Sequence, residues 1–310
     1  MNILKWMKRE NSGLARSTLE HAKYEERLGH QVAIREPQGQ LLWGQPFEPD
    51  LHTIHSQLGM DAYHDGKPRI MLMHGEPLSS VGNGISMRAI IGLASLMDCF
   101  ICMRKAELAV WNLVKRTHYV PKGVDLEVFR PLEGVEKLEG EPAVLYYENQ
   151  RGTRNPLYII AAMAQVHQRN PKARLHIYNI TDKRMADCWQ DFTKHSKLWT
   201  FLRTLNGPVA QDKVPALLNR ADIVVSALYP LSARGIEALA CGRCYISAGY
   251  DGGEGQYPWI VPDYSVEAFA ETIEACWGDY GKVNYREYAE KYHDEAECAK
   301  ARCDIYARYL

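Results

Sequence analysis

Three polar segments, each directly after an apolar run, contain the side chains best suited to chemistry. Residues 74–84 (HGEPLSSVGNG) are rich in glycine and hydroxyl groups, residues 148–155 (ENQRGTRN) carry Arg151 and Arg154, and residues 229–237 (YPLSARGIE) end in a carboxylate. Guanidinium groups bind diphosphates in a bidentate manner, and a carboxylate accepts hydrogen bonds from sugar hydroxyls. These residue types indicate a site for a polar, phosphorylated ligand.

Simpler explanations exist for two of these segments. Residues 74–84 have the composition of an ordinary surface loop. Glu237 falls in the first turn of an expected helix, where a carboxylate interacts favourably with the helix dipole without any ligand. Residue type and spacing leave both explanations open.

The elements expected to position these segments alternate between strand and helix. Residues 1–7 and 31–35 are expected strands around a helix at 14–28, with Gly29 as its stop, which is the βαβ unit of a doubly wound parallel sheet. The same alternation predicts strands at 69–73, 99–103, 118–120, 143–147, 174–178, 221–227 and 244–248, and helices near 87–96, 157–168, 212–219, 235–240 and 266–310.

A stretch rich in Pro, Gly and charge, residues 126–138, divides the alternating pattern into two series. The expected fold class is therefore α/β, with two Rossmann-like domains facing each other across a cleft. We place the first domain at residues 1–134, the second at 135–283, and a C-terminal helix at 284–310 that crosses back to the first domain.

Composition excludes several other classes of protein. With 46% hydrophobic and 24% charged residues over 310 positions, the chain is not disordered, collagenous or a coiled coil. The net charge of -1 gives no global attraction to nucleic acid or to an anionic membrane. The first eight residues lack a signal-peptide core, and the apolar stretch 90–103 is shorter than the roughly 20 residues that span a bilayer. We expect a cytoplasmic protein with no membrane span and with reduced thiols at its eight cysteines.

Three segments resemble those of GT-B glycosyltransferases of family four. Residues 120–131 (VPKGVDLEVFRP) resemble the segment at their domain junction, residues 232–250 (SARGIEALACGRCYISAGY) their donor-site segment, and residues 28–32 (LGHQV) the end of their opening loop and helix. The three segments occur in the family's order, and the coarse pattern agrees over nearly the whole chain.

The resemblance implies a retaining, metal-independent glycosyltransferase that needs no cofactor besides a nucleotide-sugar donor, a UDP-sugar. The second domain would bind the donor and the first domain the acceptor. By position, His74 would contact the donor sugar near the reacting centre, and Glu237 would bind the ribose. Arg154 and Arg151 would stabilise the leaving diphosphate. The implied donor-binding residues are Gly13, Tyr229, Ser232, Arg234, Gly235, Ile236 and Glu237, of which Arg234, Gly235 and Ile236 would supply backbone at a helix N-terminus.

The sequence departs from the family at three places. Tyr229 stands where the first glutamate of the donor motif belongs, and Glu148 stands where an arginine of the phosphate pair belongs. Residues 179–181 (NIT) replace the usual Gly-x-Gly. An altered donor, or a non-catalytic protein that binds nucleotide sugars, therefore remains an alternative, as does an epimerase of similar fold.

Two Cys-x-x-Cys pairs, Cys99/Cys102 and Cys241/Cys244, have the spacing of zinc ligands. The first lies in a strand-like run, where alternation turns side chains to opposite faces, and the second straddles the end of a helix and the start of a strand. We interpret both pairs as buried thiols and predict no metal site.

The acceptor is not encoded in any motif: a small molecule, a glycan, a lipid or a modified DNA base would each suit the family. Neither half is basic enough to predict duplex binding. The short first domain would suit a phage-type enzyme acting on modified DNA bases, with Lys8/Arg9 and Lys115/Arg116 as local phosphate contacts.

Overall fold

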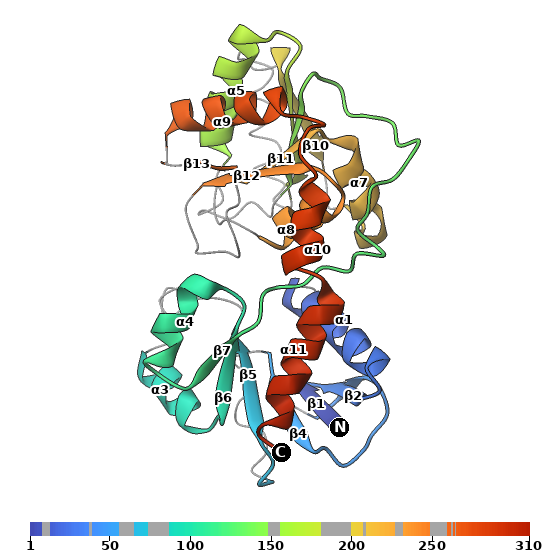
Figure 1. Cartoon of the computed structure of the whole chain (residues 1–310), viewed down its shortest axis with the longest axis vertical. Helices are drawn as coiled ribbons and strands as arrows, with labels where there is room; N and C mark the ends of the chain where they lie inside the picture. Colours follow the sequence, from blue (N-terminus) through green and yellow to red (C-terminus); the bar gives the residue numbers. More distant parts are fainter. Residues whose placement is uncertain are drawn as a thin grey trace. The chain divides into compact units, whose positions relative to one another are not determined.

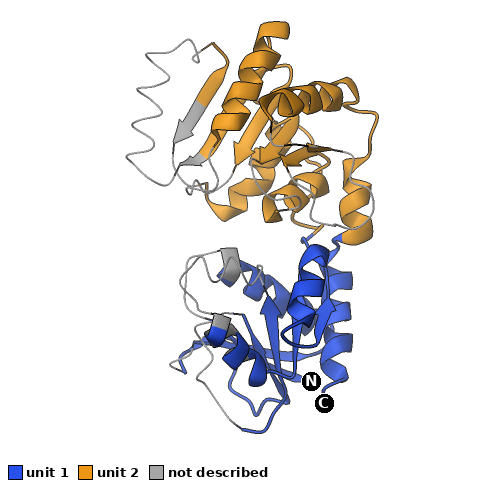
Figure 2. Cartoon of the chain, turned by 90° about the vertical axis from the view of Figure 1, so that its left-hand side faces the viewer, with its two compact units in different colours: residues 1–125, 293–310 blue, residues 126–292 orange. Residues whose placement is uncertain are grey.

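Each of the two units of the chain is built on its own sheet. The structure is a computed structural model that describes residues 1–7, 13–36, 39–55, 65–73, 87–147, 156–180, 200–206, 209–226, 232–248, 259–261, 263 and 265–310. Unit 1 comprises residues 1–125 and 293–310, and unit 2 comprises residues 126–292 (Figure 2). The predicted α/β class with two Rossmann-like sheets is confirmed (Figure 1).

Unit 1 has a seven-stranded sheet in the order β3-β2-β1-β4-β5-β6-β7, parallel except for β3. Its strands are β1 (Asn2–Trp6), β2 (Gln31–Arg35), β3 (Leu41–Trp43), β4 (Leu51–Ile54), β5 (Arg69–Met73), β6 (Cys99–Cys102) and β7 (Thr117–Tyr119). Its helices are α1 (Gly13–Arg27), α3 (Met87–Ser95), α4 (Lys105–Asn112) and α11 (Glu295–Ala307).

Both faces of this sheet are covered, which explains its continuous apolar strands. Ile3 and Ile101 pack with α1 and α11 on one face, whereas Leu4 and Phe100 pack with α3 and α4 on the other. Gly29 ends α1 with a φ of 84°, which lets the amide of His30 donate to the carbonyl of Glu25 at 3.1 Å.

Unit 2 has a six-stranded, all-parallel sheet in the order β10-β9-β8-β11-β12-β13. Its strands are β8 (Ala143–Tyr147), β9 (Arg174–Ile180), β10 (Leu202–Asn206), β11 (Ile223–Ser226), β12 (Cys244–Ala248) and β13 (Ile260–Val261). Its helices are α5 (Leu157–Arg169), the 3-10 turn η2 (Gln211–Lys213), α7 (Val214–Arg220), α8 (Ala233–Ala240), α9 (Val266–Gly278) and α10 (Tyr285–Tyr292). Helix α5 packs with α9, and α8 packs with α7 and α10 (Figure 1).

The chain passes from unit 1 to unit 2 after Asp125, earlier than the boundary at residue 134 that the sequence suggested. Residues of the expected linker are hydrogen-bonded within unit 2. The side chain of Asn219 accepts from the amide of Leu132 at 2.9 Å, and the amide of Leu138 donates to the carbonyl of Arg220 at 2.9 Å. These bonds make the stretch part of the second unit.

The expected helix over residues 284–310 is two helices that belong to different units. Helix α10 is in unit 2 and α11 is in unit 1. The break falls where the amide of Val124 donates to the carbonyl of His293 at 2.8 Å, and Asp294 then caps α11 by accepting from the amide of Ala296 at 2.9 Å. In the described part of the chain, no helix is both long and apolar enough to cross a membrane.

Candidate functional site

The strand order of the second sheet identifies where a ligand would bind. Connections run outward from β8 toward β10 on one side and from β11 toward β13 on the other, so the order reverses between β8 and β11. Ligands of doubly wound sheets bind outside the carboxyl ends of the strands at such a switch point. Here those ends are Tyr147 and Ser226. The polar segment 148–155 starts directly after Tyr147, and two residues separate Ser226 from the polar segment 229–237.

Helix α8 follows β11 and begins at this edge. Ser232 is its N-cap: its Oγ accepts from the amide of Gly235 at 3.2 Å, and its carbonyl accepts from the amide of Ile236 at 3.0 Å. Ser232 Oγ also lies 3.2 Å from the hydroxyl of Tyr245 on β12. The first turn of α8 is therefore fixed to the neighbouring strand by a side-chain hydrogen bond.

Gly235 is required by the close approach of α8 to β12. A Cβ at this position would lie 2.4 Å from Cε1 of Tyr245. The ring of Tyr245 is itself buried, so it has no room to move aside. The absence of a side chain at Gly235 lets the helix start lie directly against the strand.

The polar centre of the site is an ion pair between Arg234 and Glu237. Nη1 of Arg234 lies 2.6 Å from Oε2 of Glu237, and its guanidinium carbon lies 4.8 Å from the ring centre of Tyr147. Glu237 is 5% exposed, whereas the Arg234 side chain retains a quarter of its accessible surface. A buried carboxylate paired to a guanidinium that lies over an aromatic ring is held in one orientation.

The structure brings together Ser232, Arg234, Gly235, Ile236 and Glu237 at the N-terminal end of α8, as their closeness in the sequence predicts. The side chain of Ile236 is buried in the core, and its amide already donates within the turn. The side chain of Arg234, rather than the backbone alone, is therefore the group that this turn presents.

Five other predicted site residues are not among those that the structure describes at the start of α8. Gly13 is the first residue of α1, directly after the polar segment that follows β1, at the switch point between β1 and β4 of the first sheet. The remaining four, His74, Arg151, Arg154 and Tyr229, lie outside the described residues.

Sequence reasoning missed the two tyrosines that hold this site. Tyr147 supplies the ring below Arg234, and Tyr245 supplies the hydroxyl beside Ser232. Tyr147 is the last residue of an apolar strand and precedes a polar segment, which is the one signal that pointed to it. Tyr245 reads as an ordinary core residue, because its contact with α8 depends on packing across the sheet.

The cysteine pairs do not form a shared site. Cys99 and Cys102 pack into the clusters on opposite faces of the first sheet, so their sulfurs cannot reach one ion. Burial raises the pKa of Cys99 to about 11 and that of Cys102 to about 12, which keeps both protonated at neutral pH. Sγ of Cys244 is in contact with Sγ of Cys276 on α9, and it does not share a site with Cys241.

Comparison with known proteins connects this geometry to a family. Residues 142–279, which include the whole candidate site in unit 2, match the family described as glycosyl transferases group 1. None of the curated protein sequences matches the chain.

Several solved structures share the whole fold. Sucrose-phosphate synthase from Thermosynechococcus elongatus superposes with a TM-score of 0.78 at 16% identity, covering 99% of this chain and 98% of that one. HepE of Anabaena in complex with UDP-glucose gives 0.75 at 15% identity, covering 99% and 100%. An alpha-glucosyltransferase in complex with UDP and a 13-mer DNA containing an HMU base gives 0.70 at 11% identity, covering 99% of both chains.

The match of the second unit and the fold of the whole chain lead to one class of enzyme. The protein is a glycosyltransferase with the two-domain GT-B fold, and its second unit carries a glycosyl transferases group 1 domain.

Proposed function

We propose that the protein transfers a sugar from a UDP-sugar to an acceptor hydroxyl, with retention of anomeric configuration and without a metal ion. The observation that carries the proposal is the Arg234–Glu237 pair at the switch point of the unit that matches group 1 transferases. Support for UDP comes from HepE, whose structure holds UDP-glucose.

Glu237 is proposed to accept hydrogen bonds from the ribose hydroxyls of the donor. Its carboxylate lies in the second turn of α8, and Arg234 in the first turn fixes it from one side through Oε2. Because the carboxylate is buried, a hydrogen bond that it accepts from a ribose would be shielded from competing water. This gives the nucleoside a fixed position at the edge of the sheet.

Arg234, together with the predicted Arg151 and Arg154, is proposed to stabilise the departing diphosphate. In the reaction, the bond between the anomeric carbon and the β-phosphate oxygen breaks, and a bond from the acceptor oxygen forms on the same face of the sugar. The acceptor proton passes to the departing phosphate. Negative charge therefore grows on the β-phosphate, where arginines and a helix N-terminus are stabilising. These groups would stabilise the leaving diphosphate, which is the role of the metal ion in metal-dependent transferases.

The experiment is a panel of UDP-sugars tested first for binding by thermal shift and then for release of UDP. Binding with release supports transfer, and NMR of the product linkage then reports retention or inversion. Stabilisation by UDP without release from any donor would instead identify a non-catalytic binding protein. No stabilisation by any nucleoside diphosphate or sugar donor would refute the proposal.

A hydroxymethylated DNA base is a second candidate for the acceptor. It is favoured by the alpha-glucosyltransferase bound to UDP and HMU-containing DNA, which matches this chain over 99% of both lengths. Radiolabelled transfer from the active donor to a short duplex containing that base, with the unmodified duplex as control, tests it. If no label is incorporated into either duplex, the proposed transferase uses a different acceptor.

A further inference from the structure

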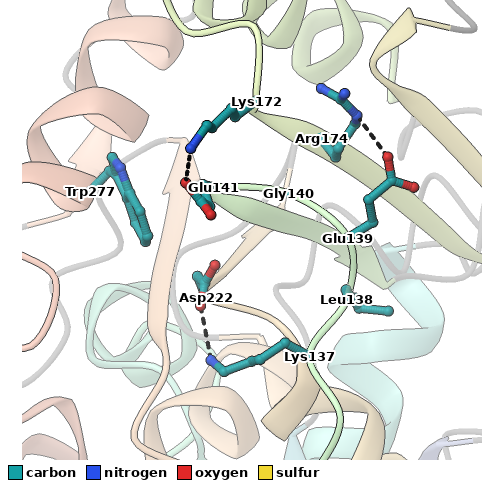
Figure 3. A pocket seen from close by; sticks show the side chains of 9 residues that line it. All are labelled: Lys137, Leu138, Glu139, Gly140, Glu141, Lys172, Arg174, Asp222 and Trp277. Carbon is teal, nitrogen blue, oxygen red and sulfur yellow. Dashed lines mark hydrogen bonds and ion pairs between the residues drawn. The ribbon is translucent and has the colours of Figure 1, made fainter.

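A cavity lies in unit 2, away from the switch point. Its volume is about 540 Å³, within the range of small-molecule sites. It is lined by the segment that leads into β8, by the starts of β9 and β11, and by the end of α9 (Figure 3). These are the amino ends of the strands. The cavity is therefore at the opposite edge of the sheet from Tyr147 and Ser226, and it shares no described residue with the candidate donor site.

The charged side chains of this cavity are paired with one another. Lys137 Nζ lies 2.9 Å from Oδ1 of Asp222, and Lys172 Nζ lies 3.0 Å from Oε2 of Glu141 (Figure 3). Arg174 Nε lies 3.1 Å from Oε1 of Glu139. The lining thus has three cations and three carboxylates, which cancel.

Two of the carboxylates have further partners that fix their orientation. Asp222 accepts from the amide of Ala143 through Oδ2 at 2.9 Å. Glu139 also accepts from Arg203 at 2.7 Å, and the hydrogen bonds from Arg203 hold the pKa of Glu139 below its usual value. The polar lining is therefore ordered, while Glu141 and Lys172 remain largely exposed at the rim.

One wall of the cavity is aromatic. Trp277, at the end of α9, faces the carboxylates of the opposite wall (Figure 3). Its ring packs against Tyr280, with centroids 5.1 Å apart, and the hydroxyl of Tyr280 accepts from Lys137 at 3.1 Å. The indole is thereby held in place by the same group of side chains that carries the charges.

This combination discriminates between classes of ligand. A phosphate would be repelled by the carboxylates that are already paired with each cation. A divalent cation would be repelled by Lys137, Lys172 and Arg174. A neutral ligand rich in hydroxyls meets neither penalty, because paired charges offer both donors and acceptors. An indole ring at one wall also suits the apolar face of a sugar ring.

We propose that this cavity is a second, non-catalytic binding site for a neutral saccharide. The proposal does not depend on the transfer reaction, because it concerns an edge of the sheet that the donor site does not use. Binding there would hold a glycan on unit 2 independently of UDP.

The test follows the indole N–H resonance of Trp277 by NMR during titration with maltotriose, cellotriose or chitotriose. Trp277→Phe identifies the resonance among those of the seven tryptophans. At least one trisaccharide is expected to shift it, equally with and without UDP. Glu141→Gln should weaken that binding about fivefold to tenfold, the effect of one lost hydrogen bond to a charged group. The control is Glu271→Gln. Glu271 is an exposed carboxylate on α9, the helix of Trp277, and lies outside the cavity, so this substitution should leave trisaccharide binding unchanged.

Three results would overturn the proposal. They are no shift of the Trp277 resonance with any trisaccharide, a shift with inorganic phosphate alone, or a response to trisaccharide that UDP abolishes. The last would place the sugar in the donor site. Whether UDP binds at all is recorded separately in the same titrations, so a failure of the proposed donor site is distinguishable from a failure of the saccharide site.

Discussion

Arg234 and Glu237 are joined by a contact of 2.6 Å across one turn of α8, and the guanidinium of Arg234 lies over the ring of Tyr147. The pair connects the helix that follows β11 with the end of β8, the two strands of the switch point. The Arg234 side chain therefore positions the Glu237 carboxylate and also places a positive charge at the switch point.

Replacing Arg234 is expected to weaken donor binding. Arg234→Ala removes both the ion pair and the guanidinium over Tyr147, and it should raise the dissociation constant for UDP about tenfold or more, as for loss of a charge-assisted hydrogen bond at a buried group. Arg234→Lys should retain only part of the affinity for UDP, because an ammonium group lacks the planar, forked geometry of a guanidinium and stacks less well on an aromatic ring. Calorimetry with UDP measures both.

The matched control is Arg169→Ala. Arg169 pairs with Glu274 at 2.6 Å, but its side chain is half exposed, and exposed pairs contribute little. An equal loss of UDP affinity in Arg169→Ala and Arg234→Ala would show that the ion pair of α8 has no special part in the site.

Gly235→Ala is expected to destabilise unit 2. The new Cβ would overlap the ring of Tyr245, and relieving such overpacking typically costs about 1–3 kcal/mol. Gly92→Ala on α3 is the control, because nothing lies within 4 Å of a Cβ there. Within a helix that change should stabilise by about 0.5–1 kcal/mol. Urea unfolding followed by circular dichroism gives both values, and effects of the same sign would contradict the packing described for α8.

Arg302→Leu is expected to be strongly destabilising. Arg302 on α11 is buried, with Nη2 at 2.5 Å from Oε1 of Glu295 and Nε at 3.6 Å from Oε1 of Glu25. Removing it leaves two buried carboxylates with less compensation, a loss of about 3–5 kcal/mol. Lys300→Leu, on the exposed side of the same helix, should change the unfolding free energy by less than about 0.5 kcal/mol. A small effect of Arg302→Leu in chemical denaturation would mean that this cluster does not anchor α11.

His176 is expected to make stability depend on pH. Burial lowers the pKa of His176 below 6.5, although its Nε2 is bonded to the carbonyl of Glu139 at 2.7 Å. Between its folded pKa and 6.5 the unfolded chain binds more protons than the folded chain. The unfolding free energy should therefore rise with pH up to about 6.5 and level off above it.

The measurement is the unfolding free energy of the wild type and His176→Gln between about pH 5 and pH 7. Glutamine retains a donor for the Glu139 carbonyl but does not titrate. The variant should show a smaller rise with pH, whereas an unchanged slope would assign the dependence to other histidines.

The strands whose bounds the sequence predicted correctly are those with continuous apolar runs. β2, β5, β8 and β12 have the expected bounds, because parallel strands covered on both faces require uninterrupted apolar residues. β4 was missed since its four residues include His52 and Thr53. His52 is satisfied in this buried position because Trp6 donates to its Nδ1 at 3.0 Å and Asp65 Oδ2 lies 2.7 Å from its Nε2. Such partners come from distant parts of the chain.

The candidate site was predictable to a similar degree. A serine and a glycine three residues apart, shortly after an apolar strand and followed by a glutamate, indicated the start of α8. The pairing of Arg234 with Glu237 and its position over Tyr147 were not predictable, because the sequence equally allowed Glu237 to interact with the helix dipole alone. The long C-terminal helix was predicted as one element since its periodicity runs through the break at His293 and Asp294, which tertiary hydrogen bonds impose.

The most direct measurement is calorimetric titration of UDP into the wild type, Glu237→Gln and Glu271→Gln. Glu237→Gln keeps the shape of the side chain but loses the charge at the centre of the site. UDP is expected to bind the wild type and Glu271→Gln equally, and to bind Glu237→Gln about tenfold or more weakly. Equal binding to all three proteins, or binding to none, would contradict a UDP-sugar site at the start of α8.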